Sequence, residues 1–235
     1  RLSTGELAFR ADDVPPLAAK RFHFSPGKAE AAGSARADKT TLSNGRVRLS
    51  LNPVNGAISG FVAEGVAADL VDGKSGRGLN EYFYVTGRSP TNILSNGPAT
   101  ITVQDAGPLV ASLRVESEAP GCQGLVREMR LIDGLNRVDL INSLDKRDVR
   151  EKESVHFGFA FAVPDGQIRM DAPWAVVRPE EDQLPGACKN YLTIGRWIDL
   201  SNTRFGVTWA TVDAPLVEIG DITVDVPTPF DPKVW

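Results

Sequence analysis

Short runs of alternating apolar and polar residues, each ended by a turn sequence, restrict the fold of this chain more than any other feature. Val47, Leu49 and Leu51 alternate with polar residues, and the sequence NPVNG follows at 52–56. Alternation with a period of two is typical of a strand with one buried face. Asn-Gly supplies the positive φ angles that a tight hairpin turn requires. We therefore predict an antiparallel hairpin over residues 46–62.

The same pattern recurs along the chain. REMRLIDGLNRVDLINSLD, at 127–145, has Asp-Gly between two alternating runs, and GRWIDLSNTRFGVTWATVD, at 195–213, has Ser-Asn-Thr in the same place. The 22 Gly and 16 Pro residues favour many short strands joined by turns rather than long helices. No unit of 20–50 residues repeats, which disfavours a propeller or a solenoid. We predict an all-β fold of two packed antiparallel sheets, a two-layer sandwich.

The composition is that of an ordinary globular protein. The 235 residues are 42% hydrophobic and 24% charged, enough to form one large β-domain. A net charge of −4 argues against a general phosphate-binding surface, so we expect no nucleic-acid partner. No apolar run is long enough to span a bilayer, and we expect no membrane partner. Neither end of the sequence predicts a cellular compartment.

Metal-binding and redox motifs do not stand out. The two cysteines, Cys122 and Cys188, are far apart in the sequence, and either a disulfide or two separate thiols would fit them. The chain has two histidines and no CxxC or HExxH spacing. We therefore predict no metal site and no cofactor within this chain.

Three of these hairpins resemble segments of the family 38 glycoside hydrolases, the α-mannosidases. The 195–213 sequence is similar to their "RWxDLS…(F/Y)GV" hairpin, and LSNGRVRLSLNPVNGAISGF, at 42–61, resembles the segment that opens their large C-terminal sandwich. The pair at 127–145 is similar to a long antiparallel pair of the same sandwich. The resemblance covers about 7–221 and implies a β supersandwich of the galactose-mutarotase-like type.

The resemblance also implies the domain boundaries and which part of the natural protein is catalytic. It gives a leading strand segment and linker over 1–39 and a supersandwich domain over 40–235, which we expect to be truncated at both ends of the natural chain. In the family, retaining hydrolysis of terminal mannosides depends on zinc and an aspartate nucleophile, both in regions that precede the sandwich. Nothing in this sequence matches those regions, so we assign it no catalytic residue and no zinc ligand. Its expected partners are its own upstream catalytic domain and mannosides.

Aromatic residues near charged ones are the best candidates for carbohydrate contact. Aromatic faces pack against the apolar face of a pyranose, while Asp and Arg groups bond its hydroxyls. Trp174, and Trp197 with its neighbours Arg196 and Asp199, meet this description. Trp209, on the next strand, is equally suited to such contact. The alternative for all three tryptophans is that they fill the space between two sheets.

His156 is the remaining candidate for carbohydrate contact, and the alternative is that it is a buried or hydrogen-bonded structural histidine. It lies in VHFGFAFAV, and its strand face continues with small residues, Gly158 and Ala160, over which a ligand could approach closely. An aldose 1-epimerase uses a histidine acid and a glutamate base on a related sandwich, but the partner histidines of that family are missing here. An epimerase-like enzyme and a stand-alone carbohydrate-binding module are therefore the two alternatives to a non-catalytic part of a glycosidase.

Overall fold

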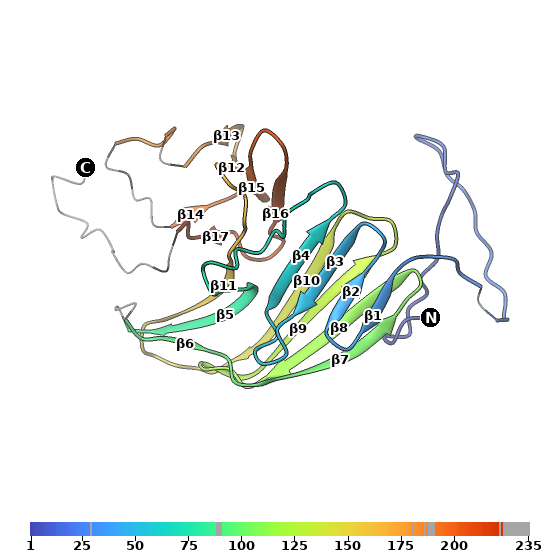
Figure 1. Cartoon of the computed structure of the whole chain (residues 1–235), viewed down its shortest axis with the longest axis horizontal. Coiled ribbons are helices and arrows are strands. Elements are labelled where there is room, and N and C mark those ends of the chain that lie inside the picture. The colour runs from blue at the N-terminus through green and yellow to red at the C-terminus, as the bar shows by residue number, and fades with distance from the viewer. Residues whose placement is uncertain are drawn as a thin grey trace. The chain divides into compact units, whose positions relative to one another are not determined.

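Every regular element in the described part of this computed structural model is a β-strand (Figure 1). The structure describes residues 1–28, 30–87, 91–179, 181–185, 187, 191–220 and 222. The strands are β1 Arg36–Asp38, β2 Thr41–Ser43, β3 Val47–Leu51, β4 Ile58–Ala63, β5 Leu79–Thr86, β6 Ile93–Ser95, β7 Ala99–Ala106, β8 Val110–Ser117, β9 Cys122–Ile132, β10 Val138–Lys146, β11 Glu153–Phe159, β12 Gln167–Ala172, β13 Ala175–Val177, β14 Leu192–Thr193, β15 Trp197–Ser201, β16 Gly206–Ala210 and β17 Leu216–Val217.

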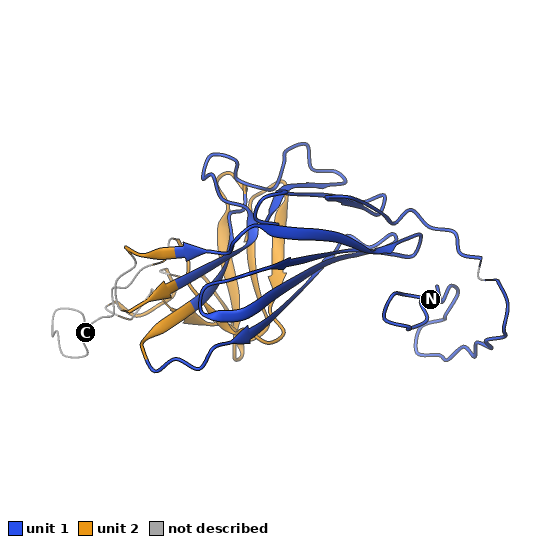
Figure 2. Ribbon diagram, turned by 90° about the horizontal axis from the view of Figure 1, so that it is seen from below, with its two compact units in different colours: residues 1–84, 94–150, 155–161 blue, residues 85–93, 151–154, 162–235 orange. Residues whose placement is uncertain are grey.

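The chain forms two compact units, drawn in different colours in Figure 2. Unit 1 comprises Arg1–Tyr84, Leu94–Arg150 and Val155–Phe161. Unit 2 comprises Val85–Ile93, Glu151–Ser154 and Ala162–Trp235. Each unit has its own hydrophobic core, so each is described by itself.

Unit 1 is a sandwich of two antiparallel layers. One sheet has the order β1-β2-β3-β4-β5-β11, with β6 paired to β5, and the other has the order β10-β9-β8-β7. Alternate residues of β3, such as Leu49, and of the facing strands, such as Leu113 and Leu131, are fully buried in one common cluster. The predicted hairpins are present, because β3 pairs with β4 and β9 with β10 in antiparallel register. The prediction of an all-β sandwich is confirmed.

A buried arginine lies between these layers. Arg127 of β9 is fully inaccessible, and its Nη1 donates to the carbonyl oxygen of Asn80 at 2.9 Å while its Nη2 donates to that of Asn55. Burial lowers the pKa of Arg127 to about 10, and the nearby Glu81 carboxylate acts in the opposite direction. The guanidinium therefore ties the turn before β4 to the start of β5.

The leading segment differs from the prediction. The alternation at residues 7–10 predicts a short strand there, but the described residues before Arg36 form none, so this prediction is wrong. The ring of Phe9 instead packs against those of Phe22 and Phe24, at 5.2 and 5.1 Å between centroids. Alternating apolar and polar residues are compatible with a strand, but a strand forms only where another strand is available to pair with it. Sheet pairing begins with β1, within the segment expected to be a linker.

Unit 2 contains the sheet β13-β12-β15-β16 and the pair β14-β17. Its core contains Met170, Leu192, Ile194 and Val217, with Trp209 packed against it. The predicted hairpin at 195–213 is present as β15 and β16. Among the described residues, the structure has no helix long and apolar enough to cross a membrane.

Candidate functional site

One face of the unit 2 sheet is polar. Register pairs Gln167 with Ser201 and Arg169 with Asp199, while Met170 and Ile198 are paired on the opposite, core-facing side. Because side chains alternate along a strand, the polar residues of β12 and β15 share one face. The sheet thus separates an apolar side that packs the core from a side rich in hydrogen-bonding groups.

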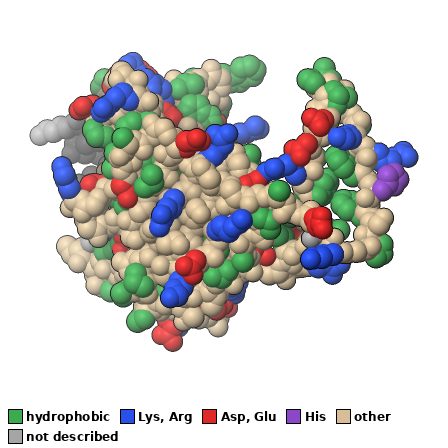
Figure 3. Space-filling model, turned by 45° about the vertical axis from the view of Figure 1, so that its right-hand side comes forward, with side chains coloured by type: hydrophobic (Ala, Val, Ile, Leu, Met, Phe, Trp, Pro, Cys, Tyr) green, Lys and Arg blue, Asp and Glu red, His purple; other side chains and the backbone are tan. Residues whose placement is uncertain are grey.

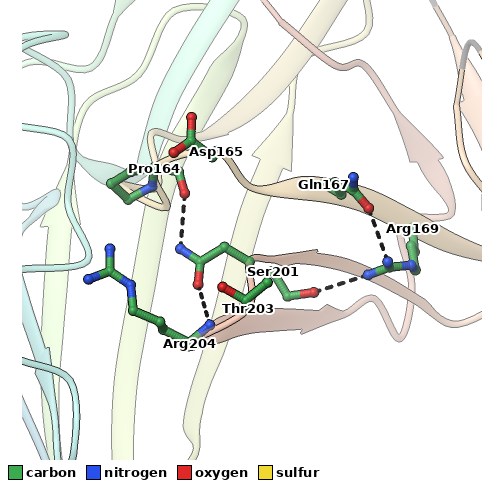
Figure 4. A pocket seen from close by; sticks show the side chains of 8 residues that line it. Pro164, Asp165, Gln167, Arg169, Ser201, Thr203 and Arg204 are labelled. Atoms are coloured by element: carbon green, nitrogen blue, oxygen red, sulfur yellow. Dashed lines mark hydrogen bonds between the residues drawn. The ribbon is translucent and has the colours of Figure 1, made fainter.

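A cavity of about 300 Å³ opens at the end of this polar face, beside the turn between β15 and β16. Figure 4 shows its lining, which consists of Pro164, Asp165, Gln167, Arg169, Ser201, Asn202, Thr203 and Arg204. All eight residues belong to unit 2, so the cavity is built within one unit.

A chain of hydrogen bonds fixes one wall of the cavity. Arg169 donates from Nη2 to Gln167 Oε1 at 3.1 Å and from Nη1 to Ser201 Oγ at 3.3 Å. Ser201 Oγ donates to Asp199 Oδ2 at 2.6 Å, and Thr208 Oγ1 donates to Asp199 Oδ1 at 2.8 Å. Arg169 is therefore held by neutral groups, while the Asp199 carboxylate is engaged by hydroxyls.

The amide of Asn202 fixes the opposite wall. Its Oδ1 accepts from the backbone N–H groups of Arg204 at 2.8 Å and Phe205 at 3.0 Å, which closes the turn. Its Nδ2 donates to the carbonyl oxygen of Pro164 at 2.9 Å, which joins the turn to the neighbouring loop. The guanidinium of Arg204 and the carboxylate of Asp165 have no hydrogen bond or ion pair among the described residues. Two opposite charges thus line the cavity without being committed to partners.

A carboxylate of the neighbouring strand β12 binds the backbone at the start of β15, which begins at Trp197. Asp171 Oδ1 accepts from the backbone N–H of Arg196 at 2.6 Å and from that of Trp197 at 2.9 Å. These two hydrogen bonds to the charged form lower the pKa of Asp171 below its ordinary value. The carboxylate therefore contributes to the stability of unit 2 only while it is ionised.

We expect this contribution to disappear in acid. A group with a lowered folded-state pKa stabilises above its unfolded pKa, about 3.9 for Asp, and loses that effect as pH falls through the folded value. The urea midpoint of unit 2, followed by tryptophan fluorescence, should fall below about pH 4, and Asp171→Asn should reduce this dependence. Asp213→Asn, at an exposed carboxylate, is the matched control. An unchanged pH dependence in Asp171→Asn would contradict the assignment.

The tryptophan candidates are placed differently from one another. Trp197 and Asp199 share the polar face, with Trp197 half-buried. Trp209 pairs with Ile198 and so lies on the other face, packed against the core. Trp197 and Trp209 therefore lie on opposite faces of the sheet, because Trp209 pairs with Ile198 and Trp197 pairs with Ala210.

Trp174 is the most exposed of the carbohydrate candidates. It follows Pro173 in the two-residue turn between β12 and β13, and its side chain is fully exposed, at a relative accessibility of 105%. Its φ of 66° lies in the left-handed region that bulky residues rarely adopt. Proline followed by a residue with positive φ is the arrangement that a type II turn requires, and glycine is usual at that second position. The turn therefore holds a large aromatic ring in solvent at a cost in backbone energy.

His156 lies in β11, in the part of that strand that belongs to unit 1. The small residue next on its face has a packing role, because a Cβ on Gly158 would lie 2.7 Å from the ring of Phe83. His156 thus belongs to a different unit from Trp174, Arg196, Trp197 and Asp199.

Sequence reasoning missed several polar residues of the cavity, Asp165, Gln167, Arg169 and Arg204 among them. Polar residues alternate in the sequence of β12, but only the pairing of β12 with β15 shows that they share a face with the polar residues of β15.

No group of three or more His, Cys, Asp or Glu side chains that could hold a metal occurs in the described part of the chain. The described residues therefore do not fit a zinc site, and no chemical step that uses zinc is assigned to them. Cys122 is buried, and Cys188 lies outside the described residues.

Comparisons with known proteins agree with this architecture at the level of the fold. No family model matches the sequence, and neither does any curated protein. The structure is similar to that of an α-mannosidase from Enterococcus faecalis V583, with a TM-score of 0.57 and 12% identity over 77% of this chain and 24% of that one. It is also similar to a protein of glycosyl hydrolase family 38 from Enterococcus faecalis, with a TM-score of 0.56 and 13% identity over 77% of this chain and 25% of that one. The chain therefore has the all-β fold of a part of these glycosidases and spans about a quarter of their length.

Proposed function

We propose that this chain is a non-catalytic β-sandwich portion of an α-mannosidase-like glycoside hydrolase. Its role is to support a retaining hydrolysis site that another domain of the same polypeptide carries. The single observation behind this proposal is the fold similarity to two glycosidase structures, which extends over 77% of this chain. The hairpin sequences at 42–61 and 195–213 point to the same family independently of the fold.

The partners follow from this role. The upstream catalytic domain and mannosides are the proposed partners, and zinc belongs to the catalytic domain. Nucleic acid and membranes are not proposed as partners. On the face shown in Figure 3, Lys and Arg side chains are interspersed with Asp and Glu side chains. On the sandwich itself, Trp174, Arg196, Trp197, Asp199 and His156 are the proposed points of carbohydrate contact.

The experiment compares the 235-residue chain with the full-length product of its gene. Both are assayed with 4-nitrophenyl α-mannopyranoside, with and without a zinc chelator. We expect turnover by the full-length protein, lost on chelation, and no turnover above the buffer rate by the 235-residue chain. Because support requires no chemistry from the sandwich, zinc-independent turnover by the chain alone would refute the proposal.

A stand-alone carbohydrate-binding module is the second candidate, favoured by the fully exposed Trp174. A ring held in solvent at the tip of the β12–β13 hairpin provides a flat apolar surface for a pyranose. In a separate calorimetric titration, micromolar binding of mannosides by the chain alone, lost in Trp174→Ala or Trp197→Ala, would favour this candidate. Anomer interconversion by the chain, lost in His156→Ala, would favour the epimerase.

A further inference from the structure

The cavity beside the β15–β16 turn is held in part by hydrogen bonds within the protein. Asn202 bonds both its own turn and the loop at Pro164, and Gln167 and Ser201 hold Arg169. The turn, the neighbouring loop and Arg169 therefore need little further ordering when a ligand binds, whereas the exposed side chains of Asp165 and Arg204 are ordered only on binding, at a cost in entropy.

Its uncommitted groups are of two complementary kinds. Arg204 and the remaining N–H groups of Arg169 can only donate hydrogen bonds, and the carboxylate of Asp165 can only accept them. Figure 4 shows Arg169 and Arg204 on opposite sides of Ser201, which ends β15, and Thr203, which lies in the turn. A sugar hydroxyl both donates and accepts, so a ring with several hydroxyls can use donors and acceptor together.

The local charges favour a neutral ligand. Arg169 and Arg204 contribute two positive charges, and Asp165 together with Asp199, which is bonded to the lining Ser201, contributes two negative charges. An anion would gain from the guanidiniums but would also meet two carboxylates. A volume of about 300 Å³ lies at the small end of ligand pockets and suits a single ring.

We propose that this cavity is a binding site for one neutral sugar residue, held through its hydroxyls by Asp165, Arg169 and Arg204. The site lies at the other end of β12 from the exposed Trp174 turn. None of the residues proposed above for carbohydrate contact lines it, although Asp199 is bonded to the lining Ser201. It does not depend on the proposed role in a glycosidase, because binding is a property of this chain alone.

The test is a titration of the intact 235-residue chain with methyl α-mannopyranoside, followed by protein-observed NMR. We expect a Kd on the order of 1 mM, as for a ligand of this size. Asp165→Asn and Arg204→Ala should each weaken binding about tenfold or more, because the first removes the charge and replaces one acceptor oxygen by a donor, and the second removes the guanidinium donors. Asp165 has a φ of 55°, which asparagine also tolerates, so Asp165→Asn should fold normally.

Controls separate the possible results. Asp213→Asn makes the same charge change at an exposed position outside the cavity and should leave the Kd unchanged. No binding by the unaltered chain, or binding that survives both cavity substitutions, would overturn the proposal. Tighter binding of mannose 6-phosphate, displaced by inorganic phosphate, would show an anion site and would overturn it as well. None of these readouts depends on hydrolysis, so their failure is distinct from failure of the proposed function.

Discussion

Replacing Arg127 by leucine should lower the free energy of unfolding of unit 1 by about 3–5 kcal/mol. The guanidinium is fully buried and satisfies the carbonyl oxygens of Asn55 and Asn80, while the Glu81 carboxylate nearby is also buried. Leucine fills part of the volume but removes this donor from the buried Asn80 carbonyl oxygen, leaves the Asn55 carbonyl oxygen only the Asn96 amide as a donor, and leaves a buried negative charge uncompensated. The cost is therefore larger than that of losing packing alone.

The measurement is hydrogen exchange of the β8 and β9 amides in increasing urea, which reports on unit 1 directly. All four tryptophans follow residue 162 in the sequence, so tryptophan fluorescence follows unit 2 in the same samples. Arg114→Leu is the matched control, since Arg114 is 41% exposed and pairs with the exposed Glu116. That control should cost less than about 1 kcal/mol. Equal losses of unfolding free energy in the two variants would mean that the burial of Arg127 does not increase its contribution to stability.

Gly56→Ala is the second substitution from which we expect a large effect, a loss of about 2–5 kcal/mol in unit 1. Gly56 ends the turn before β4 with a φ of 72°, where a Cβ is strained. That Cβ would also lie 2.3 Å from Val115 Cγ1 and 3.0 Å from Arg127 Nη2. Both contacts are in the buried interior, so the turn or the facing sheet must move.

The matched control for Gly56→Ala is Gly124→Ala in β9. A Cβ on Gly124 meets no atom within 4 Å, and its φ is outside the left-handed region. Alanine there should leave the unfolding free energy unchanged or raise it by up to about 1 kcal/mol, because it restricts the unfolded chain. If the same exchange experiment shows comparable destabilisation of both variants, close packing at Gly56 is not the cause of the loss.

Local sequence signals were sufficient for the hairpins. The alternating runs with Asn-Gly, Asp-Gly or Ser-Asn-Thr between them became β3–β4, β9–β10 and β15–β16. These elements pair with the next strand along the chain, so the turn residues and the period of two contain the needed information. The same signals failed at 7–10, where alternation had no strand to pair with.

The candidate site depended on information that the sequence does not contain. A period of two indicates which residues of one strand share a face, but it does not give the register between strands. Register put Trp209 behind the sheet and left Trp197 and Asp199 on the polar side. It also put Arg169 opposite Asp199, which no spacing rule could have paired.

The amino-acid sequence by itself determined the class of fold and its hairpins, because these follow from contacts between neighbours along the chain. Only the tertiary structure decided that Arg127 is buried and that Asp165 and Arg204 line one cavity. These outcomes depend on which distant segments pack together, and the free energy of that packing is shared among residues that no local pattern connects.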